Sequence, residues 1–330
     1  MSLEPFVVAR HLHLSNHDSP PKAVSVPQVQ QRYAQADAIV VEEHGSFMPP
    51  SEPDDAAPGP MVLHGCEWAT PIHPPNRPEN RHHVGLMGVD SLEQSRLKIQ
   101  GYDLPELQSQ KVHLADGALV LNHPEYPYID HLSSPQALDY LLPENEAKAF
   151  DAVELFNDVG FTGSSPAEVL KWVEKNFYAR GLFPAMVGGQ DDHGPSPVAK
   201  EPSFTIAMVN RRSEAGFMAA VREGRTFVSK APEARVNLSL DGDSLWESPQ
   251  SPGPGRHEFK ASLSGLPPGA VIEVVRGGEV ISRSVATAGS NQLAVGLTLP
   301  KQGTGPDYLY LRVWREPGKL HTVSSAFPLS

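Results

Sequence analysis

Residues 6–13, with the sequence Phe-Val-Val-Ala-Arg-His-Leu-His, place a short apolar run directly before two histidines. An apolar run of this length is typical of a β-strand. Because residues i and i+2 of a strand face the same side, both imidazoles can reach one cation. His11 and His13 are therefore candidate metal ligands at a strand end. A pair of surface histidines is the alternative that this motif alone leaves open.

The first 230 residues repeat short apolar runs that alternate with helical patterns. One helix start is well marked, because Ser165 precedes Pro166 and Glu168 completes a capping box. Strands that alternate with helices pair in parallel, which predicts a β/α sheet or barrel. The expected strands are residues 6–10, 38–41, 61–64, 83–87, 118–122 and 152–156, and the expected helices are residues 27–36, 90–98, 135–142, 166–179 and 213–223.

The pattern changes after about residue 231, where no helical period remains. Turn sequences such as Pro252-Gly253-Pro254-Gly255 and Gly277-Gly278 separate short strand-like runs. About seven strands in 100 residues predict a small, Ig-like β-sandwich. We therefore expect a first domain of residues 1–230 and a sandwich domain of residues 231–330. The expected strands are residues 235–240, 257–263, 270–275, 279–284, 291–298, 308–314 and 320–326.

Acidic residues and histidines are concentrated in the first part of the chain. Residues 1–231 contain 18 Lys and Arg against 30 Asp and Glu, whereas residues 232–330 contain nine of each. Twelve of the 14 histidines lie in the first 193 residues. Affinity for nucleic acid needs clustered Lys and Arg, so a nucleic-acid polymer is not expected as a partner. Histidine is the commonest metal ligand, and this distribution indicates metal chemistry in the first part.

Composition excludes several other classes. No stretch approaches the roughly 18–20 apolar residues of a membrane span, so membrane insertion is not expected. The only cysteine, Cys66, excludes internal disulfides and cysteine-rich zinc modules. We expect it to be a buried small apolar residue. Residues 1–10 lack the basic start of a secretory leader. The sequence leaves the compartment, cytoplasmic or periplasmic, and the oligomeric state open.

Three further motifs of acids and histidines follow predicted strands, and a fourth, residues 191–193, follows Gly188-Gly189. Each alone is compatible with a solvated loop or an acidic turn. Active sites of parallel β/α proteins lie at the carboxyl ends of strands, so five such motifs in one chain predict a shared site. Oxygen and imidazole ligands without cysteine suit two or three Zn²⁺, Mn²⁺ or Fe²⁺ ions. The four motifs are Glu43-His44, Gly65-Cys66-Glu67, His123-Pro124 and Asp191-Asp192-His193.

The order of these motifs resembles the PHP (polymerase and histidinol phosphatase) family of metal-dependent hydrolases over roughly residues 6–230. The shared features are His-x-His, an acidic-His pair, Gly-x-Glu, a histidine before an apolar run, His-Pro and a closing Asp-x-His. Residues 151–157 are similar to the family's acidic strand before Asn, and residues 222–228 to a segment of its carbaryl-hydrolase-like branch. That branch often carries a β-rich C-terminal domain. The resemblance implies a distorted β/α barrel followed by the sandwich.

The resemblance also implies how the ligands would share the ions. One ion would have four ligands, and one of these would bridge to a second ion. A third ion would take two histidines and a residue from the turn after the first motif. The implied ligands are His11, His13, Glu67 and Asp191 for the first ion, Glu67, His83 and His123 for the second, and His44 and His193, helped by His17 or Asp18, for the third.

Departures from the family pattern make the third ion the weakest. Ala9 stands where the family often has Asp, Glu43 replaces the usual Asp before His, and residues 17–19 replace its Ser-Asp-Gly turn. His82 competes with His83 as a ligand. We favour His83 because an apolar run follows it, as in the family.

The implied activity is hydrolysis of a small-molecule substrate by metal-activated water. Glu67 and Asp191 would act in catalysis through the ions, and His17 or His193 would supply a proton to the leaving group. The family favours phosphomonoesters or phosphodiesters, and the branch allows aryl carbamates, esters or amides. The rivals are a non-catalytic metal-binding scaffold and an amidohydrolase barrel. Amidohydrolase sequences also begin with His-x-His, but their barrel usually requires a longer chain than residues 1–230.

Overall fold

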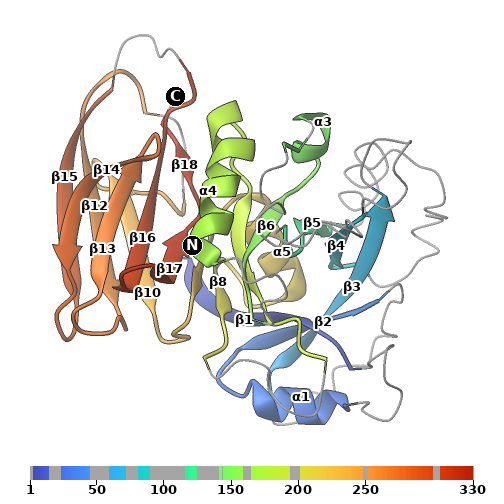
Figure 1. Cartoon of the computed structure of the whole chain (residues 1–330). Helices are drawn as coiled ribbons and strands as arrows, with labels where there is room; N and C mark the ends of the chain where they lie inside the picture. The colour runs from blue at the N-terminus through green and yellow to red at the C-terminus, as the bar shows by residue number, and fades with distance from the viewer. Residues whose placement is uncertain are drawn as a thin grey trace.

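The protein is a mixed α/β fold with many strands and few helices, and its N-terminal and C-terminal strands lie on opposite sides of helix α4 (Figure 1). Among the residues that the structure describes, the strands form a large sheet of 14 strands and a second sheet of four. A computed structural model describes residues 3–14, 24–44, 59–71, 81–89, 116–124, 141–142, 144–158, 165–193, 201–247, 252–299 and 305–329.

Nine strands of the large sheet come from the first part of the chain. The pairs β1–β2, β2–β3, β5–β6 and β6–β7 are parallel, as predicted, whereas β4 is antiparallel to both of its neighbours. Strands β7, β8 and β9 were not predicted. The bounds are Glu4–Leu12 for β1, Ala38–His44 for β2, Met61–Pro71 for β3, Arg81–Met87 for β4, Ala118–Leu121 for β5, Ala152–Asn157 for β6, Ala185–Gly189 for β7, Phe204–Val209 for β8 and Thr226–Ser229 for β9.

The helices partly follow the sequence prediction. The capping box at Ser165 is confirmed, since its side chain accepts a hydrogen bond from the backbone N–H of Glu168. The predicted helix 90–98 and residues 135–140 of the next lie outside the described residues. No helix in the described part of the chain is long and apolar enough to cross a membrane. The bounds are Val26–Arg32 for α1, Glu144–Ala147 for α3, Pro166–Asn176 for α4, Tyr178–Arg180 for the 3-10 helix η3 and Glu214–Arg222 for α5.

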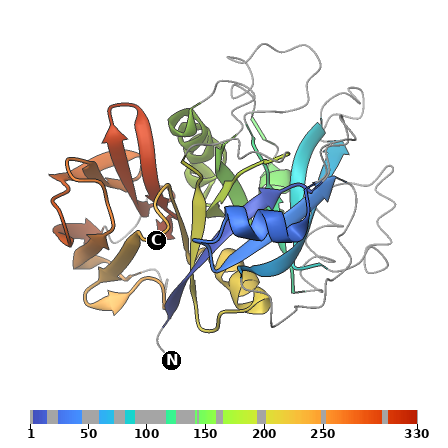
Figure 2. The same ribbon diagram turned by 90° about the horizontal axis from the view of Figure 1, so that it is seen from below.

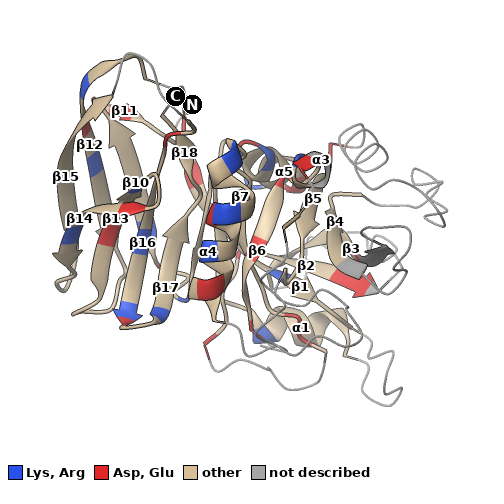
Figure 3. Cartoon of the chain, turned by 45° about the horizontal axis from the view of Figure 1, so that its top comes forward, with Lys and Arg blue, Asp and Glu red and all other residues tan. Residues whose placement is uncertain are grey.

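All seven strands predicted after residue 231 are present, together with two short ones. They gather on one side of α4 (Figure 2), and their Lys and Arg are interspersed with Asp and Glu (Figure 3). Strands β10, β11, β12 and β15 form the second sheet, and the others continue the large sheet. The bounds are Arg235–Leu240 for β10, Asp243–Ser244 for β11, Gly255–Ser264 for β12, Val271–Arg276 for β13, Glu279–Val285 for β14, Asn291–Leu299 for β15, Tyr308–Glu316 for β16, Lys319–Ser324 for β17 and Phe327–Pro328 for β18.

The large sheet runs through both parts of the chain. Strand β9 pairs with β17, with Ser229 opposite Thr322. One hydrophobic cluster also contains residues from both parts, such as Phe227 and Trp246. A separate sandwich domain beginning at residue 231 stays a prediction, and such a domain would share a sheet with the first.

The barrel that the resemblance implies is not shown, because the large sheet is an open path that ends at β7 and β14 among the described residues. The chain after β7 does return to β1. Leu12 and Asp192 form an isolated parallel bridge, and the N–H of Gln190 donates to the carbonyl of Arg10 at 3.0 Å. This return places residues 191–193 beside the two histidines that follow the first apolar run.

Candidate metal centre

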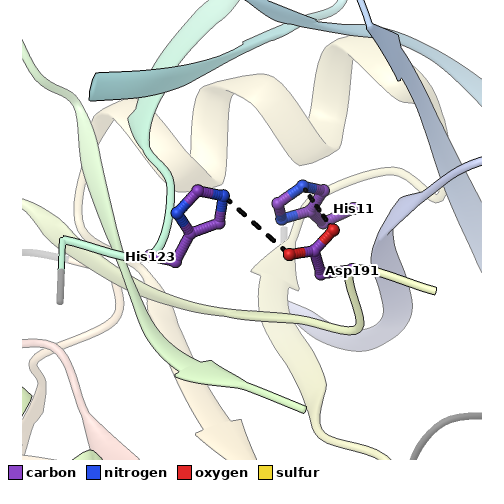
Figure 4. Close-up of side chains that lie close together, drawn as sticks. All are labelled: His11, His123 and Asp191. Carbon is purple, nitrogen blue, oxygen red and sulfur yellow. Dashed lines mark ion pairs between the residues drawn. The ribbon is translucent and has the colours of Figure 1, made fainter. Parts of the chain in front are cut away.

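The predicted ligands that the structure describes meet at one edge of the large sheet, where its parallel strands have their carboxyl ends. His11 lies near the end of β1 and Glu67 lies in β3, whereas His123 and Asp191 follow β5 and β7. His83 reaches the same edge from the start of β4, which runs antiparallel to β3. Figure 4 shows the side chains of His11, His123 and Asp191 turned toward one another.

The four residues predicted for the first ion are buried and close together. His11 Nε2 lies 3.0 Å from Glu67 Oε1 and 3.6 Å from Asp191 Oδ1. His13 Nε2 lies 3.4 Å from the same Asp191 oxygen and 3.6 Å from Glu67 Oε2. Two imidazoles and two carboxylates thus converge on one small volume. The ligand atoms of His11, His13 and Glu67 lie within 4.8 Å of one another, as a metal site requires.

The residues predicted for the second ion form an adjoining group. Glu67 Oε1 lies 3.0 Å from His83 Nδ1 and 3.1 Å from His123 Nε2. These three residues are a second set that could hold a metal ion. Glu67 belongs to both groups. A carboxylate that bridges two ions must contact the ligands of both in this way. The side chain of His82 lies outside the described part, so the choice of His83 over His82 stays a prediction.

The third ion stays a prediction as well. His193 Nε2 lies 2.8 Å from Asp191 Oδ1, and its ring stacks on that of His13 with centroids 4.0 Å apart. His193 therefore lies against residues assigned to the first ion. The backbone of His44 is paired with that of Glu67. The side chain of His44 lies outside the described part, as do the two turn residues proposed to help, His17 and Asp18.

Asp192 points away from its neighbours in the motif. Its Oδ2 accepts a hydrogen bond from the Tyr33 hydroxyl at 3.0 Å and pairs with Arg32 at the end of α1. Its backbone carbonyl accepts from the N–H of His13 at 3.0 Å. Asp192 thus fixes the closing motif to β1 and α1.

Three of the candidate ligands have positive backbone φ angles, which are 60° for His11, 23° for His123 and 50° for Asp191. Such conformations cost about 1–3 kcal/mol each in residues other than glycine and cluster at functional sites. In the described part of the chain, the other non-glycine residues with positive φ are Asp116 and Asp241. Strain at three residues that face one another is an independent sign of a functional site.

A buried polar layer that the sequence did not reveal lies beneath these ligands. Arg10 is fully buried and donates to Glu42 Oε2 at 2.8 Å, Glu154 Oε2 at 2.7 Å and Asn122 Oδ1 at 2.7 Å. His11 Nδ1 also contacts Glu154 Oε2 at 2.8 Å. One sequence feature does indicate this layer: Arg10 is a charged residue inside an apolar strand run. Charged side chains are almost never fully buried unless they are paired, so partners for Arg10 could be expected.

The electrostatics favour ionised carboxylates and a proton on His11 and His123, whereas burial lowers the pKa of His13. Burial alone would raise the pKa of Glu67, but the charge of His11 and hydrogen bonds from three histidines hold it well below its usual range. The pKa of Asp191 is likewise held well below its usual range by His11 and by hydrogen bonds from His13 and His193, against the effect of burial. Burial would lower the pKa of His123, but its contacts with Glu67 raise it to about 9. The pKa of His11 is also raised well above its usual value, since nearby carboxylates outweigh burial.

We expect metal binding near neutral pH to release protons. At neutral pH both His11 and His123 are protonated in the metal-free protein, because the pKa of His123 is raised to about 9 and that of His11 well above its usual value, and an imidazole must lose its proton to bind a metal. Calorimetry in buffers of different ionisation enthalpy measures the number released, and the share from His123 should vanish as the pH rises through about 9. His123→Ala should release fewer protons than the wild type. A binding enthalpy that does not depend on the buffer would contradict this prediction.

Comparison with solved structures finds a two-domain protein from Bacteroides vulgatus that contains a predicted PHP-like metal-dependent phosphoesterase. The match covers 98% of this chain and 95% of that chain, with 15% sequence identity and a TM-score of 0.50. No family profile and no curated protein matches the sequence. At this identity the likeness concerns the fold, and the resemblance to the carbaryl-hydrolase-like branch stays a prediction. The chain is therefore similar over nearly its whole length to a two-domain protein with a PHP-like part.

Proposed function

We propose that the protein is a metal-dependent hydrolase that acts as a phosphoesterase on a small molecule, with two or three divalent ions. The observation that carries the proposal is the position of Glu67, whose carboxylate belongs to two adjoining groups of histidines. The likeness to a two-domain protein with a PHP-like phosphoesterase part supports the same activity.

The donors that line the site fit divalent ions. They are imidazole nitrogens and carboxylate oxygens, which suit Zn²⁺, Mn²⁺ or Fe²⁺. Both carboxylates, Glu67 and Asp191, are buried and keep a low pKa, so each is ionised at neutral pH. Buried negative charges need a cation, and in the metal-free protein protonated histidines take that place.

When bound, the divalent ions would supply an activated water and a positive charge beside the phosphoryl oxygen. The chain's residues orient the ligands for this chemistry. Glu154 accepts from His11 Nδ1 at 2.8 Å, which leaves Nε2 facing Glu67 and Asp191. Asn157 donates to Asp191 Oδ2 at 3.2 Å. Fixing the far side of a ligand in this way sets its tautomer and its direction.

His193, which lies at the rim of the site, and His17 are the candidates for proton transfer to the leaving group. The side chain of His193 is 24% exposed, whereas that of Asp191, which it contacts, is 3% exposed. His193 is also a proposed ligand, and ligation would prevent proton donation. His17 therefore stays a proposed donor, from the part of the chain outside the described residues.

The test combines metal analysis with two kinds of ester. Protein purified without chelator should contain two or three divalent ions per chain and should hydrolyse 4-nitrophenyl phosphate. Chelation should abolish this turnover, and added Zn²⁺ or Mn²⁺ should restore it. Turnover of 4-nitrophenyl acetate alone would favour a carbonyl substrate on the same site. Bound metal without turnover of either ester would favour a binding scaffold.

A further inference from the structure

The buried layer beneath the candidate metal centre is connected to several of the proposed ligands. Glu154 uses Oε2 for Arg10 and for His11 Nδ1, and its Oε1 accepts from Asn157 Nδ2 at 2.9 Å. Asn157 also donates to Asp191, at 3.2 Å. The contacts of Glu154 thus reach two proposed ligands, one directly and one through an amide.

A second connection starts from the other side of the guanidinium. Asn122 accepts from Arg10 Nη2 through Oδ1, at 2.7 Å, and donates through Nδ2 to Glu67 Oε1 at 3.1 Å. It also donates to Glu42 Oε2 at 3.3 Å. Arg10 is therefore linked by one intervening side chain to Glu67, the proposed bridging ligand.

The surrounding strands leave space for this layer. A Cβ atom at Gly85 would lie 2.5 Å from Glu42 Oε2 and 2.9 Å from Arg10 Nη2. A Cβ atom at Gly189 would lie closer than 3.0 Å to both carboxylate oxygens of Glu154, a separation that real Cβ atoms essentially never show. Neither glycine has a positive φ angle that would itself favour glycine. The lack of space for a Cβ atom is therefore the reason for glycine at these positions.

We propose that Arg10, Glu154, Asn122 and Asn157, here named the Arg10 platform, position His11, Glu67 and Asp191 for metal binding, while Glu42 holds the other side of the Arg10 guanidinium. This inference rests on the proposed metal-dependent function. One guanidinium faces two carboxylates, which leaves a net negative charge next to His11 Nδ1. That charge favours a proton on Nδ1, frees Nε2 for the ion and raises its basicity.

The charge states of the platform agree with this role. Burial alone would lower the pKa of Arg10, but Glu42 and Glu154 raise it, so the guanidinium stays charged. Burial would raise the pKa of Glu154, but His11 and Arg10 lower it. Glu154 therefore stays an acceptor for the imidazole N–H.

The two carboxylates that pair with Arg10 form a matched pair for a test. Glu42 and Glu154 are both fully buried and both pair with Arg10. Glu154 touches the ring of His11, whereas Glu42 contacts the backbone N–H of His11 at 3.2 Å. If these ion pairs only stabilised the fold, loss of either carboxylate charge would change the metal affinity to the same extent.

The experiment measures Zn²⁺ affinity by competition with a chromophoric chelator. Glu154→Gln should weaken binding by about 10–100-fold, the usual effect of losing a partner of a ligand. Glu42→Gln should keep the affinity within about threefold of the wild type. Unfolding midpoints of the two metal-free variants should fall to a similar extent. Glu273→Gln, a buried acid paired with Arg283 and Arg312 in the C-terminal part, should leave the affinity unchanged.

Wild-type affinity in Glu154→Gln, or equal losses in Glu154→Gln and Glu42→Gln, would overturn the proposal. If Glu154→Gln does not fold, Asn157→Ala cuts the link to Asp191 and should weaken binding by about tenfold. Unchanged affinity in that variant would likewise overturn the proposal. If the variants show the expected metal affinities but the protein hydrolyses no ester, the result would support the platform and contradict the proposed function. A wild type that binds no Zn²⁺ would overturn both.

Discussion

Glu67→Ala is expected to remove more than one ion per chain and to abolish turnover. The Glu67 carboxylate lies 3.0 Å from His11 Nε2, 3.0 Å from His83 Nδ1 and 3.1 Å from His123 Nε2, so its loss affects both proposed ion sites. Metal activation contributes several kcal/mol to transition-state stabilisation, which corresponds to about a thousandfold or more in rate. Elemental analysis and turnover of 4-nitrophenyl phosphate measure the two effects.

A control is available in another acid that contacts a histidine. Glu214 also contacts a histidine, since its Oε2 lies 3.0 Å from His64 Nδ1, but it lies outside the groups that could hold metal. Glu214→Ala should keep its ions and its turnover. Full metal occupancy in Glu67→Ala would show that Glu67 is not a ligand, and loss of one ion would show that it does not bridge.

The candidate ligands could be identified from the sequence because each motif is local. His11 and His13 are separated by one residue, as are Asp191 and His193, and each motif follows an apolar run. The Arg10 platform has no such local pattern. Arg10 reaches Glu42 across 32 positions and Glu154 across 144, and neither separation follows from a repeat or a motif. Contacts of this kind are set by the pairing of strands.

The fold was predictable to different extents in the two parts. After residue 231, every predicted strand is present, because glycine and proline turns mark the ends of alternating runs. Strand β7 was missed because two of its five residues, Gly188 and Gly189, are of a type depleted in strands. The antiparallel direction of β4 and the open path of the large sheet depend on pairing between distant segments, which periodicity does not specify.

Gly189→Ala is expected to lower the free energy of unfolding by about 3–5 kcal/mol, the usual effect of breaking a buried ion pair. The added Cβ would lie closer than 3.0 Å to both carboxylate oxygens of Glu154, so that side chain would have to move. Glu154 is fully buried and accepts from Arg10, His11 and Asn157, and any movement weakens these contacts. Urea unfolding of the metal-free protein measures the change.

The control is Gly296→Ala in β15, where a Cβ would have no atom within 4 Å. Its unfolding free energy should stay within about 0.5 kcal/mol of the wild type. Glu154→Asp shortens the side chain and withdraws its carboxylate from residue 189, so Gly189→Ala should cost less in that background than in the wild type. Additive effects of the two substitutions, or an unchanged stability in Gly189→Ala, would contradict this account. Non-additive losses would show that residue 189 is glycine because the Glu154 carboxylate occupies the space of a side chain.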